Sequence, residues 1–218
     1  MCRPARICYA GALCHIISRG NNKSELFLDD SDRREYLKLL GDKALEFCLT
    51  VHAYVLMTNH VHLLMETSQP NLSEAMCRLN FDYSSYFNKR HGRTGHLFET
   101  RFKSRLVQKD RYFLAVLRYI HLNPVKAGLV TNPESYAWSS HRAYLFGGDN
   151  IVKSPGNVLS MFSNVLENRL KQYQEFLAEG VPEKEWKILN KARNGVLGSL
   201  NFRRMILQNA TQKVPGTF

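Results

Sequence analysis

Two histidines, His60 and His62, stand two positions apart in the segment NHVHLLME. Side chains at alternate positions of a β-strand point to the same face, so a strand here would present both imidazoles side by side. Two neutral imidazoles that converge in this way can bind a divalent metal ion. The alternative is a pair of ordinary strand histidines, which the spacing alone does not exclude.

Tyr119 and Asn123 form a second pair that could do chemistry, in the segment RYIHLNPVKAG. On a helix they share one face because they are four residues apart. A phenol beside a carboxamide oxygen offers a nucleophile and a hard metal ligand, and with two imidazoles this set suits Mg²⁺ or Mn²⁺, which polarise phosphoryl oxygens. The alternative is a half-buried aromatic residue on an amphipathic helix. Tyr112 competes as nucleophile, but its partner four residues later is Val116, which cannot bind a metal.

The chain is strongly basic, with 30 lysines and arginines against 19 acidic residues and a net charge of +11. Such a charge favours nucleic acid as a partner. Basic and aromatic residues interleave over residues 90–105, as in grooves that bind single-stranded DNA, although a solvated basic edge strand is the alternative. We expect Phe98 and Phe102 to lie in the core. We expect the cationic side chains of the segment to contact DNA, namely Arg90, Arg93, Arg101, Lys103 and Arg105.

Composition and motifs exclude several classes of protein. The chain has 218 residues, of which 44% are hydrophobic and 22% charged, as in ordinary globular proteins. Its five cysteines form no CxxC pair, so we expect reduced thiols and neither a disulfide framework nor a zinc site. No apolar run reaches about 18 residues, and no signal-peptide core stands at the N-terminus, which predicts a cytoplasmic protein without a membrane partner. Phosphate-loop, HExxH and GxSxG motifs are also absent from the sequence.

The elements that must position these residues follow from hydrophobic periodicity. Residues 6–18 predict a strand. Asp32, with Glu35 three residues later, resembles a capping box that begins a helix. Residues 51–66 predict two strands joined by a tight turn at residues 57–59.

A second helix is predicted from an N-cap at Asn71 to Gly92, followed by a fourth strand over 96–108. A third helix is predicted over 110–122 and is stopped by Pro124. The order strand, helix, strand, strand, helix, strand is the ferredoxin-like split βαβ motif, in which the third strand lies centrally beside the first. The predicted fold class is therefore α+β, an antiparallel ferredoxin-like sheet with an extra helix that carries the candidate nucleophile.

The periodicity weakens towards the C-terminus, and two glycines at 147 and 148 mark a plausible hinge. We predict one domain over residues 1–146, which carries the candidate chemistry, and a helical C-terminal extension over 147–218. Helices are expected over 158–178, 182–193 and 199–210. The sequence leaves open whether this extension binds DNA or only packs against the first domain.

Three blocks of the sequence together resemble the REP-associated tyrosine transposases. In chain order they are NHVHLL, RHGRTGHLFETRFKS and YIHLNPVKAGLV. These transposases belong to the HUH superfamily of single-strand DNA endonucleases, named for two histidines around a hydrophobic residue. The resemblance covers about residues 8–145, and YAWSSHRAYL also looks like the family's continuation. The chain departs from the family at 57–59, where a proline often stands in the turn. That departure concerns only the geometry of the turn.

The resemblance implies a role for each residue of the candidate site. His60 and His62 match the family's metal-binding histidines, and Tyr119 matches its single catalytic tyrosine. Asn123 matches the polar residue that completes the metal site. The implied activity is metal-dependent cleavage and rejoining of single-stranded, hairpin (REP-like) DNA through a 5′-phosphotyrosine intermediate, as in DNA transposition, with Mg²⁺ or Mn²⁺ as cofactor. The implied location is the bacterial cytoplasm, in association with the nucleoid.

Two rival functions come from other classes. The first is a non-catalytic hairpin-DNA-binding protein derived from a transposase, although the four site residues are intact. The second is an RNA-recognition module on the same fold, which lacks the expected aromatic strand motif. The DNA sequence recognised and the metal preference stay open. So does the choice between monomer and homodimer, in which the tyrosine of one chain could serve the histidines of its partner.

Overall fold

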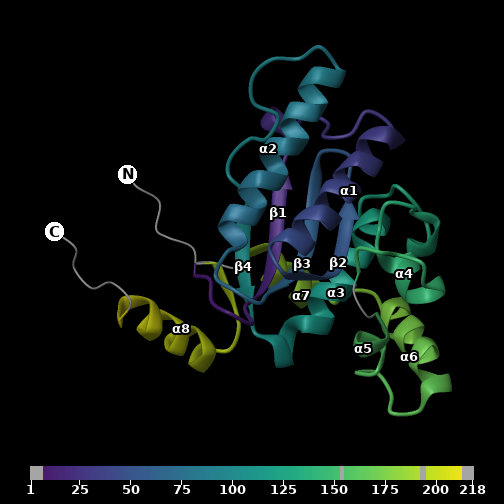
Figure 1. Cartoon of the computed structure of the whole chain (residues 1–218). Helices are drawn as coiled ribbons and strands as arrows, with labels where there is room; N and C mark the ends of the chain where they lie inside the picture. The colour runs from purple at the N-terminus through teal and green to yellow at the C-terminus, as the bar shows by residue number, and fades with distance from the viewer. Residues whose placement is uncertain (1–6, 153–154, 192–194, 213–218) are drawn as a thin grey trace.

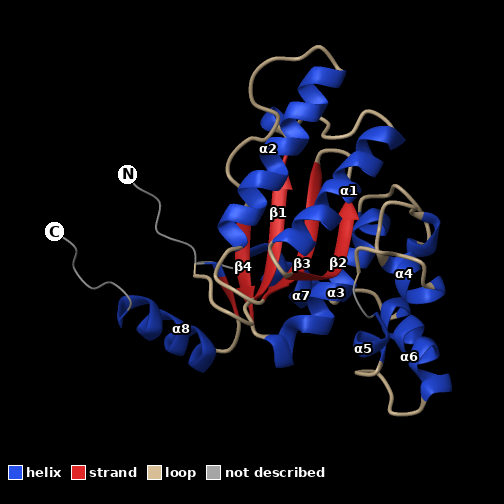
Figure 2. Ribbon diagram, in the orientation of Figure 1, coloured by secondary structure: helices blue, strands red, loops and turns tan. Residues whose placement is uncertain are grey.

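The computed structural model of the 218-residue chain describes residues 7–152, 155–191 and 195–212. One five-stranded sheet runs through it in the order β2-β3-β1-β4-β5 (Figures 1 and 2). Three neighbouring pairs are antiparallel, and the short β5 lies parallel to β4. The strands are β1 (Leu13–Arg19), β2 (Leu49–Leu56), β3 (His60–Thr67), β4 (Lys103–Val107) and β5 (Val196–Leu197).

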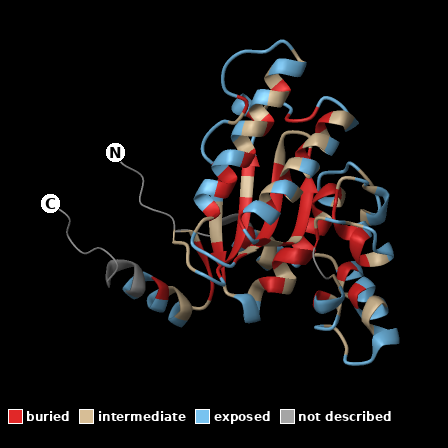
Figure 3. Ribbon diagram, in the orientation of Figure 1, coloured by how far each residue is buried: buried red, intermediate tan, exposed pale blue. Residues whose placement is uncertain are grey.

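Helices cover both faces of the sheet. α1 (Asp30–Glu46) and α2 (Leu72–Arg90) pack side by side on one face, and α3 (Lys109–Lys126) packs on the other against β2 and β3 (Figure 1). Figure 3 shows the consequence, since the strands are buried while the outer surfaces of the helices face solvent. The predicted α+β ferredoxin-like fold, with the third strand beside the first, is confirmed.

Alternation along β3 decides what each face of the sheet carries. His62 contacts Tyr119 of α3, and Glu66 pairs with Lys109 of the same helix at 2.8 Å. By the two-residue repeat of a strand, the buried Leu63 between them faces α1 and α2. The polar positions of β3 therefore point towards α3.

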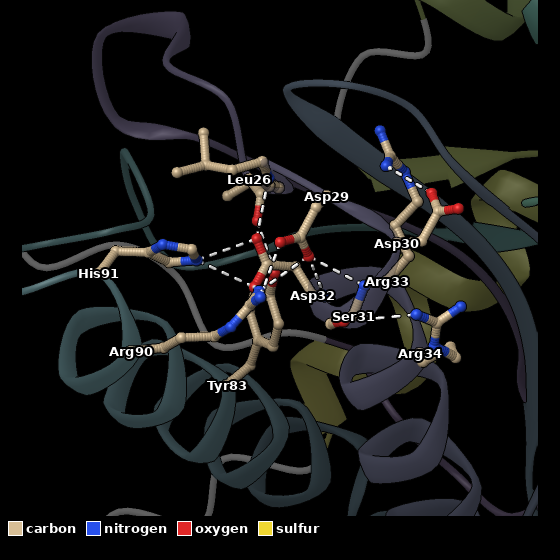
Figure 4. A network of polar contacts seen from close by, with 11 residues as sticks. Leu26, Asp29, Asp30, Ser31, Asp32, Arg33, Arg34, Tyr83, Arg90 and His91 are labelled. Carbon is tan, nitrogen blue, oxygen red and sulfur yellow. Dashed lines mark hydrogen bonds and ion pairs between the residues drawn. The ribbon is translucent and has the colours of Figure 1, made fainter.

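A buried carboxylate joins the start of α1 to the end of α2 (Figure 4). Asp32 is fully buried and accepts hydrogen bonds from the backbone amide of Leu28 at 2.8 Å and from the imidazole of His91 at 3.0 Å. The guanidinium of Arg90 contacts Asp32 at 2.5 Å and Asp29 at 2.7 Å. Arg90, which we expected to contact DNA, pairs with two carboxylates, and its contact with DNA stays a prediction.

The beginning of α1 differs from the prediction. Asp29 is its N-cap, and the Asp29 carboxylate accepts hydrogen bonds from the backbone amides of Ser31 and Asp32. The predicted capping box of Asp32 and Glu35 is wrong because the Asp32 carboxylate belongs to the buried network. By contrast, the ends of α2 are where we predicted them. Asn71 is its N-cap residue, and Gly92, with φ 59°, follows its C-cap residue. The turn between β2 and β3 is also confirmed.

Two strands are shorter than predicted. The strand expected over 6–18 begins only with β1, because the chain turns at Gly11 (φ 81°), and residue 6 lies outside the described residues. The strand expected over 96–108 is confined to β4. Before β4, the chain meets the end of β1 through a bridge between Gly20 and Phe98 and through the amide of Glu99, which donates to the carbonyl of Arg19 at 2.9 Å.

We predicted that α3 stops at Pro124, but the helix continues to Lys126. A proline removes one backbone donor from a helix. Here the last turn closes without it, because the amide of Ala127 donates to the carbonyl of Asn123 at 2.9 Å. Gly128, with φ 70°, then ends the helix.

The C-terminal part of the chain packs around α3 and the edge of the sheet. The helix predicted over 158–178 divides into two, the end of the helix predicted over 182–193 lies outside the described residues, and β5 was not predicted. Among the described residues, no helix is both long and apolar enough to cross a bilayer. The remaining elements are α4 (His141–Phe146), α5 (Pro155–Leu159), α6 (Leu166–Ala178), α7 (Glu183–Lys191), α8 (Leu200–Gln212) and the 3-10 helices η1 (Asn21–Lys23) and η2 (Pro133–Ser135).

The two phenylalanines of the basic segment belong to the core, as predicted. Phe102 is buried, and Phe98 is half-buried against the ring of Tyr83, with 6.5 Å between ring centroids. They anchor the irregular chain between α2 and β4.

Replacing Asp32 by alanine should lower the free energy of unfolding by about 3 kcal/mol at neutral pH, because Arg90 and His91 lose their buried partner. Asp30→Ala is the matched control. Asp30 lies on the same helix, is 62% exposed and pairs with Arg33 at 3.4 Å, so its loss should cost under about 1 kcal/mol. Urea denaturation followed by circular dichroism measures both, and equal losses would contradict the role assigned to Asp32.

The same carboxylate predicts a pH dependence. Burial raises the pKa of Asp32, but hydrogen bonds from His91, Leu28 and Arg90 outweigh burial and leave the pKa below its ordinary value. This stabilisation is present above the ordinary aspartate range and is lost as the pH falls through the lowered pKa. The stability difference between wild type and Asp32→Ala should therefore shrink on acidification, and a difference that grows would contradict the account.

Candidate active site

The structure brings the predicted tyrosine and histidines together within one chain. β3 carries His60 and His62, whose ring centroids lie 5.0 Å apart at 85°. α3 places the Tyr119 ring 5.4 Å from that of His62, also at 85°. The tyrosine therefore meets the histidines of its own chain.

These side chains share a pocket of about 360 Å³ with a largely cationic wall. Three of the predicted DNA-contacting residues line it, and Glu99 is its acidic member. A cationic wall beside two imidazoles and a phenol suits a phosphodiester group. The residues that line the pocket are Ile17, Arg19, His60, His62, Glu99, Thr100, Arg101, Lys103, Arg105 and Tyr119.

A third histidine, His15 of β1, completes the cluster and was missed by the sequence analysis. Its ring stacks on that of His62 with centroids 5.1 Å apart, and its Nε2 lies 3.0 Å from Nδ1 of His62. It also meets the Tyr119 ring edge-on at 5.6 Å. The signal in the sequence was weak, because His15 is a single histidine in an apolar strand and belongs to no paired motif.

All three imidazoles are held in the neutral form at physiological pH. Burial, with a smaller contribution from the charge of Arg105, lowers the pKa of His15 to about 3. Burial, with the charge of Arg19, lowers the pKa of His60 to about 4. Burial also leaves the pKa of His62 well below its ordinary value. Neutral imidazole is the form that binds a metal ion.

The donor set fits a divalent metal. Nδ1 of His60 lies 2.7 Å from the side-chain oxygen of Asn59, so it carries the proton and leaves the Nε2 lone pair available. Nδ1 of His62 is occupied by His15, which likewise leaves Nε2 as the nitrogen for a ligand. Within the described part of the chain, no three His, Cys, Asp or Glu side chains form a metal-binding group, so a site here would need oxygen ligands of another kind.

Asn123 is the predicted oxygen ligand, and it lies close to Tyr119 without lining the pocket. Its side-chain amide donates to the backbone carbonyl of Tyr119 at 2.6 Å. Burial raises the pKa of the Tyr119 phenol, whereas a hydrogen bond with the Asn123 side chain and the charge of Arg105 lower it. The net result is a raised pKa, so the phenol is protonated at neutral pH. Metal ligation by Asn123 stays a prediction and requires its side chain to turn.

The alternative tyrosine lies elsewhere. Tyr112 borders a different hollow with Gly198 and Ser199, next to the start of α8, and does not line the pocket of the histidines. Arg93, one of the predicted DNA contacts, lies over the ring of Phe87 at 5.5 Å and is likewise outside the pocket. Arg101, Lys103 and Arg105 are thus the members of the predicted basic set that reach the site.

α7 packs against the Tyr119 ring through a residue that does not line the pocket. The ring of Trp186 lies 4.6 Å from that of Tyr119, and the ammonium group of Lys126 lies 5.5 Å from the Trp186 ring. Next to it, the buried Arg118 of α3 pairs with Glu185 at 2.8 Å. These contacts, which join segments far apart in sequence, were not predicted.

A second buried polar network holds the other side of α3. His121 is fully buried and contacts the hydroxyl groups of Ser140 at 2.8 Å and Tyr173 at 2.9 Å. The Tyr173 hydroxyl also lies 2.7 Å from Nδ1 of His141. α3 is therefore tied to both α4 and α6, which fixes the helix that carries Tyr119.

Comparison with known families gives the class of protein to which the chain belongs, the transposases. Residues 8–123, more than half of the chain, match the family described as IS200-like transposases. The chain therefore belongs to the IS200-like transposase family.

Among solved structures, a REP-associated tyrosine transposase bound to a REP hairpin has a similar fold, with a TM-score of 0.55 and 19% sequence identity. The superposition covers 71% of this chain and 96% of that one, and it shows that the two proteins share a fold. A comparison with curated proteins gave no match.

If the two imidazoles hold a metal, His60→Ala and His62→Ala should each weaken Mn²⁺ binding at least about tenfold. His52→Ala is the control, because His52 lies on the neighbouring β2 and pairs with Glu66 at 3.0 Å, outside the pocket. Electron paramagnetic resonance of free Mn²⁺ during titration measures the affinity without DNA. Unchanged binding in both pocket variants would exclude these histidines as ligands.

Proposed function

We propose that this transposase nicks and rejoins single-stranded DNA through a covalent bond to Tyr119. The observation that carries the proposal is the contact between the Tyr119 ring and His62 in one pocket with cationic walls. A nucleophile, two neutral nitrogen ligands and a phosphate-binding surface are thereby within reach of one phosphodiester group. Hairpin DNA is the proposed substrate class, and the solved structure of similar fold was bound to a REP hairpin.

The chain's own residues would bind and orient the scissile phosphate. Arg101 and Lys103 line the mouth of the pocket and offer charge to the phosphate oxygens. Arg105 acts on the tyrosine, since its charge lowers the energy of the phenolate that forms during attack. His60 and His62 would hold Mg²⁺ or Mn²⁺, with Asn123 as a third ligand after its side chain turns. When bound, such an ion polarises a phosphoryl oxygen.

The covalent step conserves the number of phosphoester bonds. The Tyr119 oxygen forms a bond to phosphorus as the bond from phosphorus to the 3′ oxygen breaks. The proton lost by the phenol is balanced by the proton that the leaving 3′ oxygen gains. Attack by a 3′-hydroxyl on the phosphotyrosine reverses the step and rejoins the strand, so no nucleotide cofactor is needed.

We also propose a role for the extension over residues 147–218, whose boundary with the domain over 1–146 stays a prediction. Trp186 packs on the Tyr119 ring and does not line the pocket, so it supports the nucleophile without blocking access. Arg118 fixes this support through Glu185. On this proposal the extension positions the tyrosine, and DNA contact is a second option for its exposed surface.

The first test uses end-labelled single-stranded hairpin DNA with Mn²⁺ or Mg²⁺ on a denaturing gel. Wild type should give a nicked product and a protein–DNA adduct, and Tyr119→Phe should abolish both because the phenol oxygen is absent. Tyr112→Phe is the matched control and should keep the adduct. Chelation of the metal should stop nicking but leave hairpin binding intact. An adduct that survives Tyr119→Phe would disprove the assignment, and tight binding with no cleavage under either metal would favour a binding-only protein.

The second test concerns the support from α7. Trp186→Ala should slow adduct formation by about 10- to 100-fold while DNA affinity stays the same, because a misplaced nucleophile costs rate and not binding. Trp186→Phe should restore most of the rate. The control is Trp138→Ala, which removes the other tryptophan of the chain at a site away from Tyr119. A rate in Trp186→Ala equal to wild type would show that α7 is not needed to position Tyr119.

A further inference from the structure

A second and larger hollow, of about 830 Å³, adjoins the active-site pocket. It lies between the exposed side of α2 and residues 95–102. Three consecutive residues, Glu99, Thr100 and Arg101, line both hollows. A chain that passes over these three residues therefore runs from one hollow into the other.

The lining of this hollow combines aromatic and amide groups. Phe81 on α2 is 70% exposed, and Phe98 is half-buried beside it in the lining. Single-stranded nucleic acid binds to proteins largely by stacking bases on such exposed aromatic rings. What distinguishes Phe81 from the other exposed apolar side chains is its place in the lining of a hollow that adjoins the active-site pocket.

The polar groups of the lining include two asparagines of α2 and one carboxylate. The amide of Asn80 contacts Ser18 at 3.4 Å, and its side-chain oxygen is enclosed by the protein, so the carboxylate of Glu99 is the acceptor that a ligand in the hollow can use. Asn88 is already used, since its amide donates to the carbonyl of Gly95 at 2.9 Å. The exocyclic amine of cytosine or adenine is the donor that a nucleobase supplies.

The charges where the two hollows meet fit a DNA strand that places a base, and not its phosphate backbone, in the larger hollow. Arg101 can contact the phosphate between the two hollows. Glu99 repels phosphate but accepts from a base amine, so it favours a base, and not a backbone, on its side of the junction.

Resting on the proposed function, we propose that this hollow binds one unpaired amine-bearing nucleobase, cytosine or adenine, of the DNA strand whose scissile phosphate lies in the active-site pocket. Phe81 stacks on the base, and the carboxylate of Glu99 accepts from its amine. The hollow thereby selects the base that flanks the cleavage site. The rival occupant is a protein surface, including a second copy of this chain, which would use Phe81 as an apolar contact.

Cys77 provides a direct probe because it is exposed and lines the hollow. Cys48 is also exposed. It follows α1 and does not line the hollow, so it serves as the internal control. In the Tyr119→Phe background, which cannot form the adduct, an oligodeoxycytidylate dodecamer should slow maleimide labelling of Cys77 but not of Cys48. An abasic dodecamer of the same backbone should not. Equal protection by both oligomers, or protection that depends on protein concentration without DNA, would overturn the proposal.

A matched pair of variants tests the stacking ring. Phe81→Ala should weaken binding of the oligodeoxycytidylate about tenfold and leave binding of the abasic oligomer unchanged. Phe146→Ala removes a ring with the same 70% exposure at the end of α4 and should change neither. Because Phe81 is exposed, its loss should not unfold the protein. Equal affinities in all three proteins would refute base binding here. Absence of an adduct in wild type would instead refute the proposed chemistry and leave this test standing.

Discussion

The packing of α3 against the polar face of the sheet is the contact on which the site depends. β3 can present His60 and His62 to that helix only in one register, because a slip of one residue would turn both side chains to the opposite face. The register is set by the alternate apolar residues of β3, Val61, Leu63 and Met65, which are all buried on the opposite face. The hydrophobic core therefore determines where the imidazoles point, and α3 then brings Tyr119 to them.

Burial gives this site its chemical character. Imidazoles enclosed between a sheet and a helix lose their protonated form, and a phenol in the same place holds its proton more tightly. On the proposed function, the first effect leaves the imidazoles free to bind a metal ion, and the second means that the phenol needs nearby positive charge in order to attack. Arg105 supplies such charge from β4. The enclosure is completed by α7, so the C-terminal part of the chain contributes to the environment of a tyrosine almost 70 residues earlier in the sequence.

The sequence was informative where structure depends on neighbouring residues. The N-cap and terminal glycine of α2, the turn before His60 and the shared face of the two histidines are local features, and all are present. The misses involve partners distant in the chain. β5 forms only because β4 offers it an edge, and Arg90 forms ion pairs with two carboxylates about 60 residues earlier. His15 and Trp186 belong to no motif, so only the assembled fold shows that they surround Tyr119.

Tandem mass spectrometry of the protein after reaction with hairpin DNA and Mn²⁺ tests the central claim most directly. Nuclease and protease digestion leaves a peptide that carries the covalently linked nucleotide, and fragmentation locates the modified residue. The account predicts a single modified peptide, with the nucleotide linked through its 5′ phosphate to Tyr119. A nucleotide on Tyr112, or a nicked strand without any modified peptide, would contradict it.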